Sequence, residues 1–330
     1  MSVLESPIRD PDAAQNRRAI ATFVIRTALG CGLLGALLWI YGAQRIAHVL
    51  AHERLDCFAA AVALYIAGQV MSSYRWQLLA RINSIDGRWR EYLAYYFIGM
   101  ATNLFVPGLI GGDAARASYL GLRHRRMGEA IASVVADRGI GLVALFWMAA
   151  IGAVTVSSVR LPATLILAAA AIGIFLLIGF CLAPLVIAPL RRVGGGIGKA
   201  IAPLLPYIER PAALTPAIIL SLILQASLAF CQYLLAVGMG LRLPLSAVLL
   251  VVPMANVAAS LPLTLNGLGV REGAYVLLFG MAGVAHQDAV ALGLLWFAST
   301  MVGGLTGIVP FVLTALPQPD AVAPDALAAS

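Results

Sequence analysis

The sequence predicts an all-α polytopic membrane protein with about six spanning helices, two re-entrant helical hairpins and an inverted repeat. Hydrophobic residues make up 61% of the 330-residue chain and charged residues only 11%, whereas about a quarter of the residues in a soluble domain are charged. Long apolar segments alternate with short polar ones, and two apolar segments are broken by proline and glycine. The hydrophilic stretches are too short to hold a separate soluble catalytic domain.

Six apolar segments are long enough to cross a hydrocarbon core of ~30 Å as helices. The first follows Arg17 and Arg18, lacks a convincing signal-peptide cleavage site, and is therefore expected to stay as a span. The predicted spans cover residues 19–41, 56–80, 127–156, 161–190, 215–238 and 287–315.

The chain is expected to divide around one transmembrane domain, residues 19–315. Its halves cover about 19–190 and 215–315, and a basic linker over 191–214 joins them. Residues 1–18 are expected to form a cytoplasmic N-terminal segment, and residues 316–330 a disordered tail.

Residues 91–126 combine an apolar segment with basic loops on both of its sides. Cytoplasmic loops carry the excess of Lys and Arg, so both loops are expected on the same side of the membrane. The segment is therefore predicted to enter, turn at 106–112 and return. The flanking basic residues are Arg81, Arg88 and Arg90 before it, and Arg116, Arg123, Arg125 and Arg126 after it.

Residues 244–281 are also broken, at Pro262 and at 266–269, and are predicted to form a second hairpin that enters from the outside. Both chain termini then lie in the cytoplasm. The sequence from Pro107 to Arg116 loosely matches that from Pro262 to Glu272, since each has a proline, a glycine-rich turn and then an acid near an arginine. Corresponding broken segments in two halves point to a transporter's midplane site; a chance likeness of two turns is the alternative.

Asp137 is expected close to the middle of the membrane. It lies ten residues after Met127, which is roughly 15 Å along a helix at 1.5 Å per residue. Glu129, Ser133 and Asp137 recur at four-residue spacing and share one helix face. Arg138 lies beside that face and is placed to reach Asp113 or Glu272.

Two interpretations of these charges remain open. In the first, they face a cavity and bind a charged head group: Arg116 and Arg271 suit phosphate, because a guanidinium can hold two oxygens, and each follows a glycine-rich turn at a helix start, where anions are favoured. In the second, the charges neutralise one another and hold the hairpins in place. Unpaired charges facing a cavity would favour transport, and fully paired charges would favour a scaffold.

Arg75, Asn103 and Asn266 complete the candidate site. Arg75 is expected to extend toward the membrane interface and Trp76 to lie in an interfacial belt. Asn103 and Asn266 flank the two breaks and suit turns better than substrate contacts. The candidate substrate-binding residues are Arg75, Asn103, Asp113, Arg116, Asp137, Arg138, Asn266, Arg271 and Glu272.

The sequence gives no support to several other classes of function. It has no Ser-His-Asp order, HExxH or CxxC motif, and its four cysteines are scattered, so we expect no catalytic residues, no metal and no cofactor. The net charge of +7 fits membrane topology and anionic lipid rather than nucleic acid. No ATP-binding motif is evident, and Asp137 or Glu272 could carry a proton if transport is driven by an ion gradient.

The motifs together resemble the lysylphosphatidylglycerol synthase transmembrane (flippase-like) family over roughly residues 20–315. They are Arg75-Trp76, Asn103-x-Phe105-x-Pro107-Gly108, Gly111-Gly112-Asp113-x-x-Arg116, Ser133-Val-Val-x-Asp137-Arg138 and Asn266-Gly-x-Gly269-x-Arg271-Glu272. The resemblance implies a lipid flippase fold similar to the N-terminal half of the bacterial multiple peptide resistance factor, which moves an aminoacylated phosphatidylglycerol between leaflets. In that family the synthase activity resides in a separate cytoplasmic domain, so lipid synthesis is not expected here. Polyprenyl-phosphate-linked and hopanoid-type lipids are alternative substrates.

We therefore expect a flippase of the bacterial inner membrane rather than an enzyme. Its expected partners are membrane lipids with an anionic, zwitterionic or aminoacylated head group, together with a lipid-synthesis enzyme or a second copy of the chain. The alternatives are a scaffold or accessory subunit of a lipid or glycolipid synthesis pathway, and a membrane glycosyl or acyl transferase.

Overall fold

The protein is an all-α membrane protein throughout the part of the chain that its structure, a computed structural model, describes. That part comprises residues 31–51, 53–105, 110–155, 195–260 and 267–314, with single positions at 24, 28 and 264 and short stretches between 162 and 182. No strand occurs in these ranges, and the predicted fold class is confirmed.

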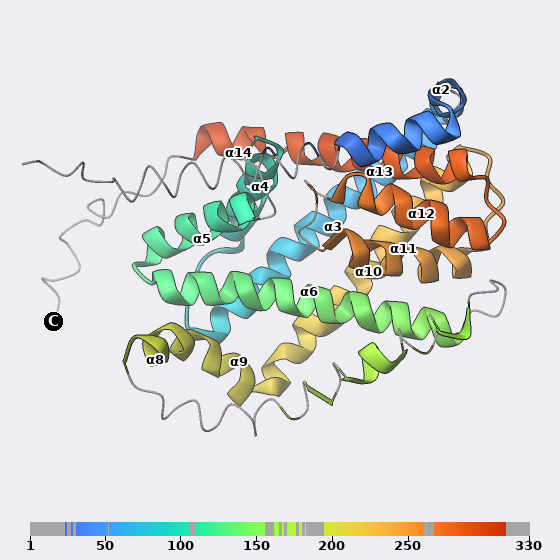
Figure 1. The fold of residues 1–330 in the computed structure, drawn as a ribbon. Helices are drawn as coiled ribbons and strands as arrows, with labels where there is room; N and C mark the ends of the chain where they lie inside the picture. Colours follow the sequence, from blue (N-terminus) through green and yellow to red (C-terminus); the bar gives the residue numbers. More distant parts are fainter. Residues whose placement is uncertain are drawn as a thin grey trace, which may run out of the picture.

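Four long apolar helices form the frame of the molecule (Figure 1). They are α3 (Leu55–Ile82), α6 (Met127–Thr155), α10 (Thr215–Gly238) and α13 (His286–Leu305). Each has the length and apolar composition of a membrane span. The third span includes η3 (Pro211–Leu214) before α10, and the fourth includes α14 (Ile308–Leu313) after α13.

A fifth candidate span is bent. The helix Cys31–Tyr41 meets α2 (Ala43–Ala51) at 90°, and Gly42 makes the turn with a φ of +85°, a value that glycine adopts without steric cost. The predicted span over 161–190 falls mostly outside the described residues. The structure thus supports a multi-pass protein with four or five spans among the described residues, and the count of six stays a prediction.

The outward faces of the long helices are apolar, as contact with lipid requires. On α6, Ile131 and Val135 are 50% and 51% exposed, and they lie on one side of the helix. On α10, Ile219 and Ile223 are likewise exposed. Exposed apolar residues at helical spacing are expected where lipid, rather than water, is the solvent.

Both broken segments form pairs of packed short helices. The first pair is α4 (Trp89–Phe105) with α5 (Ile110–His124), and the second is α11 (Leu245–Ser260) with α12 (Val270–Met281). At 1.5 Å per residue, 12 to 17 residues make helices of about 18–26 Å, shorter than a hydrocarbon core of ~30 Å. These pairs match the predicted hairpins, and the side from which each enters stays a prediction.

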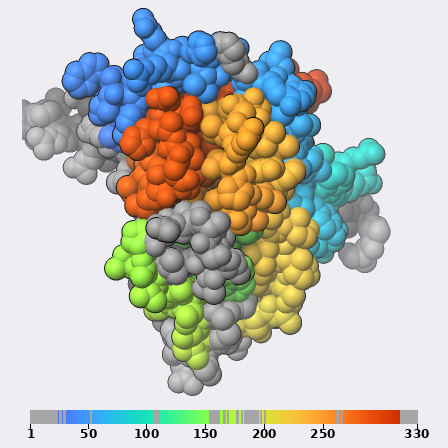
Figure 2. All heavy atoms as spheres, turned by 90° about the vertical axis from the view of Figure 1, so that its right-hand side faces the viewer, coloured from blue at the N-terminus to red at the C-terminus, as the bar shows by residue number. Residues whose placement is uncertain are grey.

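The two hairpins contact opposite ends of α6 (Figure 1). Toward the start of α6, Asp137 pairs with Arg116 of α5. Toward its end, an added Cβ on Gly152 would lie 3.0 Å from Cα of Leu250 on α11. Figure 2 shows the end of the molecule at which the second hairpin and α13, in shades of orange, lie between the N-terminal helices in blue and the end of α6 in green.

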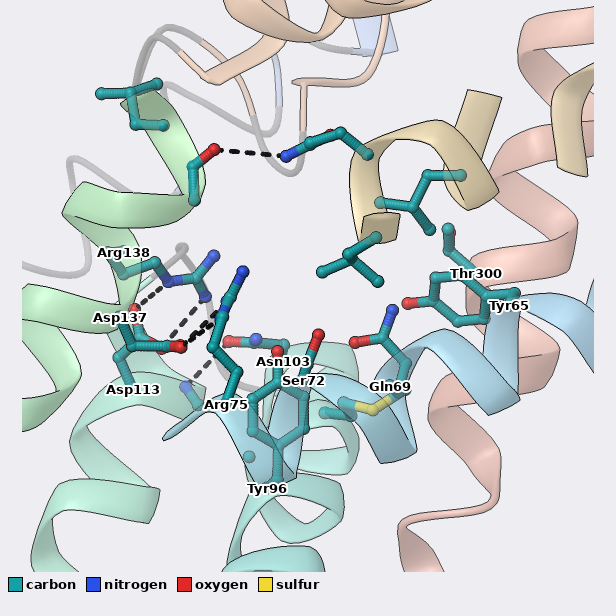
Figure 3. Close-up of a pocket in the computed structure, with 18 of the residues that line it drawn as sticks. Tyr65, Gln69, Ser72, Arg75, Tyr96, Asn103, Asp113, Asp137, Arg138 and Thr300 are labelled. Atoms are coloured by element: carbon teal, nitrogen blue, oxygen red, sulfur yellow. Dashed lines mark hydrogen bonds and ion pairs between the residues drawn. The ribbon is translucent and has the colours of Figure 1, made fainter. Parts of the chain in front are cut away.

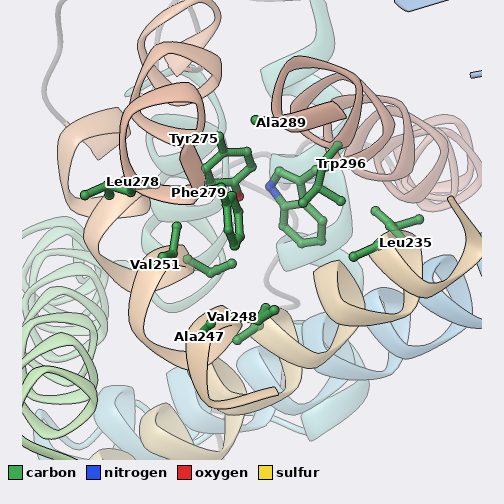
Figure 4. Close-up of a cluster of buried hydrophobic side chains, with 14 of the residues drawn as sticks. Leu235, Ala247, Val248, Val251, Tyr275, Leu278, Phe279, Ala289 and Trp296 are labelled. Atoms are coloured by element: carbon green, nitrogen blue, oxygen red, sulfur yellow. The ribbon is translucent and has the colours of Figure 1, made fainter. Parts of the chain in front are cut away.

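Two apolar clusters hold these elements together. The larger joins α10, α11, α12 and α13, with Tyr275, Phe279 and Trp296 at its centre (Figure 4). The other joins α3, α4, α5 and α6 around Trp76, whose ring meets that of Tyr92 edge-on at a centroid distance of 5.1 Å. Short helices α8 (Gly195–Ile201), η2 (Ala202–Leu204) and α9 (Leu205–Glu209) precede η3 and α10.

Candidate functional site

A cavity of about 560 Å³ lies between the long helices and the first hairpin (Figure 3). Its described lining comes from α3, α4, α5, α6, α10, α13 and the last residue of α11, Ser260. Charged side chains and apolar side chains share this lining. The apolar part includes Leu142 and Leu145 of α6 and Leu224 and Leu228 of α10. A cavity with both kinds of surface suits a molecule that has a charged head and an apolar chain.

Five charged groups form one alternating chain along the cavity. Arg75 Nε donates to Asp137 Oδ1 at 2.9 Å, and Arg116 Nη1 donates to Asp137 Oδ2 at 2.9 Å. Arg116 Nε then donates to Asp113 Oδ1 at 3.0 Å. Arg138 completes the chain with bonds of 2.7 and 3.0 Å from Nε and Nη2 to the two oxygens of Asp113. The chain ties α5 of the first hairpin to α3 and α6.

Arg116 is fully engaged by the protein. Each nitrogen of its guanidinium contacts Asp113 or Asp137, and the group lies 5.2 Å from the ring centroid of Trp76 and 5.1 Å from that of Tyr96. Only 3% of the residue is exposed. Contacts between a cation and aromatic rings add to the ion pairs, so Arg116 is built into the fold rather than free to hold phosphate.

Arg138 is the charged group most open to the cavity. It sits close to the middle of α6, yet 53% of its side chain is exposed, because it borders the cavity. Asp113 occupies two of its nitrogens, and Nη1 has no hydrogen bond to a described residue. Of the two acids that Arg138 was expected to reach, Asp113 or Glu272, it contacts Asp113.

The charges in the described lining do not balance. Three guanidinium groups, from Arg75, Arg116 and Arg138, face two carboxylates, from Asp113 and Asp137, so one positive charge is in excess. Each carboxylate already serves two arginines. The excess positive charge therefore favours binding of an anion, and no carboxylate in the described lining is free to bind a cation.

The expected surface positions of Arg75 and Trp76 are wrong. Arg75 is 5% exposed and also donates from Nη1 to Ser221 Oγ of α10 at 2.9 Å. Trp76 is fully buried, and its Nε1 donates to Ser133 Oγ at 3.0 Å. The cause is the first hairpin, which packs against this end of α3 and converts an apparent interface position into an interior one.

Asn103 closes the first hairpin, as a turn residue was expected to do. Its Oδ1 accepts the N–H of Gly112 at 2.8 Å, and its side chain also lines the cavity. Asn266 lies outside the described residues.

Arg271 and Glu272 are not brought to the charge chain. Glu272 accepts the N–H of Gly269 at 2.6 Å and caps α12, and Arg271 Nη2 reaches Glu272 Oε1 at 3.4 Å. Neither residue belongs to the described cavity lining. The structure thus brings together Arg75, Asn103, Asp113, Arg116, Asp137 and Arg138, and it leaves the second hairpin's pair apart.

An uncharged polar lining was missed at the sequence level. Tyr65, Gln69 and Ser72 of α3 and Thr300 of α13 also line the cavity, and Tyr65, Gln69 and Thr300 lie across it from Arg138 (Figure 3). Positions 65, 69 and 72 recur at helical spacing, so a polar stripe inside an apolar span was the available signal. Among the described residues, no group of three His, Cys, Asp or Glu side chains is arranged to hold a metal ion.

Comparison with known proteins identifies the family. The family described as "Lysylphosphatidylglycerol synthase TM region" matches residues 23–307. A "UPF0104 membrane protein" from Methanothermobacter thermautotrophicus is 31% identical over 127 residues, which are 38% of this chain and 38% of that protein. The segment shared with that relative is thus well under half of its length. The family match covers most of this chain, including both hairpins and every candidate site residue, and the chain therefore belongs to the lysylphosphatidylglycerol synthase TM region family.

Proposed function

We propose that this protein is a lipid flippase that moves a lipid with a charged head group, phospho- or aminoacyl-, between the leaflets of the bacterial cytoplasmic membrane. The observation that carries the proposal is the cavity beside the middle of α6, where an excess positive charge and a set of leucines share one lining. Ionisable groups at membrane depth are costly and usually mark a substrate or ion path.

The proposed mechanism uses the two hairpins. Gly112 and Asp113 follow the break of the first hairpin, Ser260 precedes the break of the second, and all three line the same cavity. Such convergence supports alternating access around a fixed site, as in transporters with repeated halves. The head group would enter beside Arg138 and compete with Asp113 for its guanidinium, while the acyl chains stay among apolar side chains.

Proton coupling through Asp137 finds little support in this geometry. Both oxygens of Asp137 accept hydrogen bonds from guanidinium groups, so a proton reaching this carboxylate must displace one of them. Glu272 is likewise engaged by Gly269 and Arg271. We therefore propose facilitated flipping down a lipid gradient as the simpler mechanism.

A membrane scaffold is the second candidate, and one observation favours it: every member of the charge chain has a partner. Lipid translocation in proteoliposomes separates the two. We expect the wild-type protein to move an anionic lipid and Arg138→Gln to slow it about tenfold or more, since a hydrogen bond to a charged group contributes about 1.5–3 kcal/mol.

Arg54→Gln is the matched control, because the Arg54 side chain is 63% exposed and its ion pair among the described residues is with Asp56, outside the cavity. A wild-type protein that moves no anionic, aminoacylated or polyprenyl-linked lipid would establish the scaffold instead. Equal rates for wild type and Arg138→Gln would remove Arg138 from the head-group site.

A further inference from the structure

The cavity has a second polar region that the charge chain does not use. In Figure 3, Tyr65, Gln69 and Thr300 lie across the cavity from Arg138, and Ser72 lies between the two sides. All four side chains are uncharged. They come from α3 and α13, so they belong to different elements from the hairpin that carries Asp113 and Arg116.

This uncharged region has unused hydrogen-bonding capacity. Ser72 is 1% exposed, and its Oγ has no hydrogen-bond partner in the described structure. Gln69 is 8% exposed, and neither its amide nor the Tyr65 hydroxyl is hydrogen-bonded to another described residue. A buried polar group without a hydrogen-bond partner is costly, so these groups point to a ligand or ordered water that satisfies them.

The chemistry of these groups indicates which ligand fits. A hydroxyl and a carboxamide each donate and accept hydrogen bonds, which matches a molecule with several hydroxyls of its own. A primary ammonium only donates hydrogen bonds, and any ammonium prefers a carboxylate, yet both carboxylates of the described lining are shared between arginines.

We infer that the cavity selects a phosphodiester lipid whose head group ends in a neutral polyol, such as glycerol or a sugar, over one that ends in an ammonium. This inference rests on the proposed flippase function and specifies the substrate class of the same site. The phosphate lies toward Arg138, and the hydroxyls lie against Gln69, Ser72 and Tyr65. Gln69 and Ser72 are then specificity-determining residues and Arg138 the anion-binding one.

The test compares four lipids with identical labelled acyl chains in proteoliposomes of the full chain: phosphatidylglycerol, phosphatidic acid, lysylphosphatidylglycerol and phosphatidylcholine. We expect wild type to move phosphatidylglycerol fastest. Gln69→Leu and Ser72→Ala should each slow phosphatidylglycerol about fivefold, the value of one neutral hydrogen bond. Neither change should alter the rate for phosphatidic acid, which has the phosphate and no polyol.

Tyr74→Phe is the matched control, because Tyr74 is on the outward side of the same helix and is 43% exposed. Equal wild-type rates for phosphatidylglycerol and lysylphosphatidylglycerol would overturn the inference while leaving the flippase function standing. Transport of phosphatidylcholine faster than phosphatidylglycerol would also overturn the inference, and would indicate that the Tyr65 and Trp296 rings bind its ammonium. An equal slowing of all four lipids by Gln69→Leu would overturn it as well. Failure of wild type to move any of the four would overturn the inference, and failure to move a polyprenyl-linked lipid as well would overturn the flippase proposal.

A binding measurement covers the case in which a variant reconstitutes poorly. The thermal midpoint of detergent-solubilised protein should rise more with short-chain phosphatidylglycerol than with short-chain phosphatidic acid, because a ligand stabilises the state that it binds. Gln69→Leu should abolish that difference. An unchanged difference in Gln69→Leu contradicts the assignment of the polyol region.

Discussion

Asp137 accepts hydrogen bonds from two guanidinium groups, and neither it nor Arg75 nor Arg116 is more than 5% exposed. Removing one partner of a buried ion pair costs about 3–5 kcal/mol, because the other charge is left unpaired. We expect Asp137→Asn to lower the unfolding free energy by about that amount, measured as a thermal or denaturant midpoint in detergent.

The double variant Arg75→Met/Asp137→Asn tests the cause. With Arg75 removed, the charge chain that remains consists of Arg116, Asp113 and Arg138. Both remaining guanidinium groups then still pair with the Asp113 carboxylate. The double variant should therefore be more stable than Asp137→Asn alone. Losses that simply add would show that Arg75 and Asp137 are not coupled.

Glu53 lies just before the start of α3, outside the long apolar helices. Burial, and then the neighbouring Asp56 carboxylate, raise the pKa of Glu53 from an ordinary 4.5 to about 7, and neither oxygen of Glu53 is hydrogen-bonded to a described residue. A carboxyl whose pKa is higher in the folded chain binds its proton more tightly there. It thus stabilises the fold fully below pH 4.5, and this stabilisation is lost as the pH rises through about 7.

The thermal midpoint of the wild type should therefore fall between pH 5 and pH 8 more steeply than that of Glu53→Gln. Asp86→Asn, which alters an exposed loop carboxylate, serves as the control and should keep the wild-type slope. A slope left unchanged by Glu53→Gln contradicts the role given to burial at this carboxyl.

At the site, the sequence was sufficient for some residues and not for others. The depth and helix face of Asp137 follow from spacing along one helix, and the same spacing left Asp113 and Glu272 as the two possible partners of Arg138. Arg75 and Trp76 could not be placed in this way, since a hydropathy pattern measures distance along one helix and does not reveal a neighbouring hairpin that covers the helix end. Gln69 and Ser72 were missed because uncharged polar residues hardly disturb an apolar segment.

At the scale of elements, the first hairpin depends on close contact between two glycines. A Cβ added to Gly99 of α4 would lie 2.7 Å from the carbonyl oxygen of Gly112 on α5, and a Cβ on Gly112 would clash with the carbonyl oxygen of Gly99. Because both neighbours are backbone atoms, a methyl group can fit only if the helices separate. We expect Gly99→Ala and Gly112→Ala each to cost about 1–3 kcal/mol or more and to loosen the contact of Asn103 with Gly112.

Gly139 is the matched control for this prediction. It lies in α6 beside Arg138, with nothing within 4 Å of an added Cβ. Gly139→Ala should therefore be neutral or stabilising by up to about 1 kcal/mol, through helix propensity. Thermal midpoints of the three variants in detergent provide the comparison, and equal losses at all three glycines would argue against the close contact.

The hairpins themselves could be predicted because two independent signals conflicted. Residues 91–112 have the hydropathy of a span, while the basic loops on both sides indicate that the segment does not cross the membrane. A pair of short helices, α4 and α5, that enters and returns is consistent with both signals. The contact between Gly99 and Gly112 could not be predicted, because which glycines meet depends on the rotation of each helix about its axis.

At the scale of the whole molecule, the proposal requires a cavity that water and head groups can enter from the membrane surfaces. Cysteine accessibility measures this directly in a background where Cys31, Cys57, Cys181 and Cys231 are replaced by Ala. Gln225→Cys and Ser260→Cys, which line the cavity, should react with a charged, membrane-impermeant thiol reagent. Ile131→Cys and Val135→Cys, on the outward apolar face of α6, should not.

The side from which the reagent arrives distinguishes a static site from a transporter. A cavity that stays open to one face would let reagent label Ser260→Cys from that face alone. Alternating access exposes one site to each side in turn, so reagent added to either face of oriented vesicles should label it, more slowly from the less populated side. Added phosphatidylglycerol should slow labelling from both faces by occupying the cavity. Labelling confined to one face, and unaffected by lipid, would fit a scaffold whose charge chain serves only to join the first hairpin to α3 and α6.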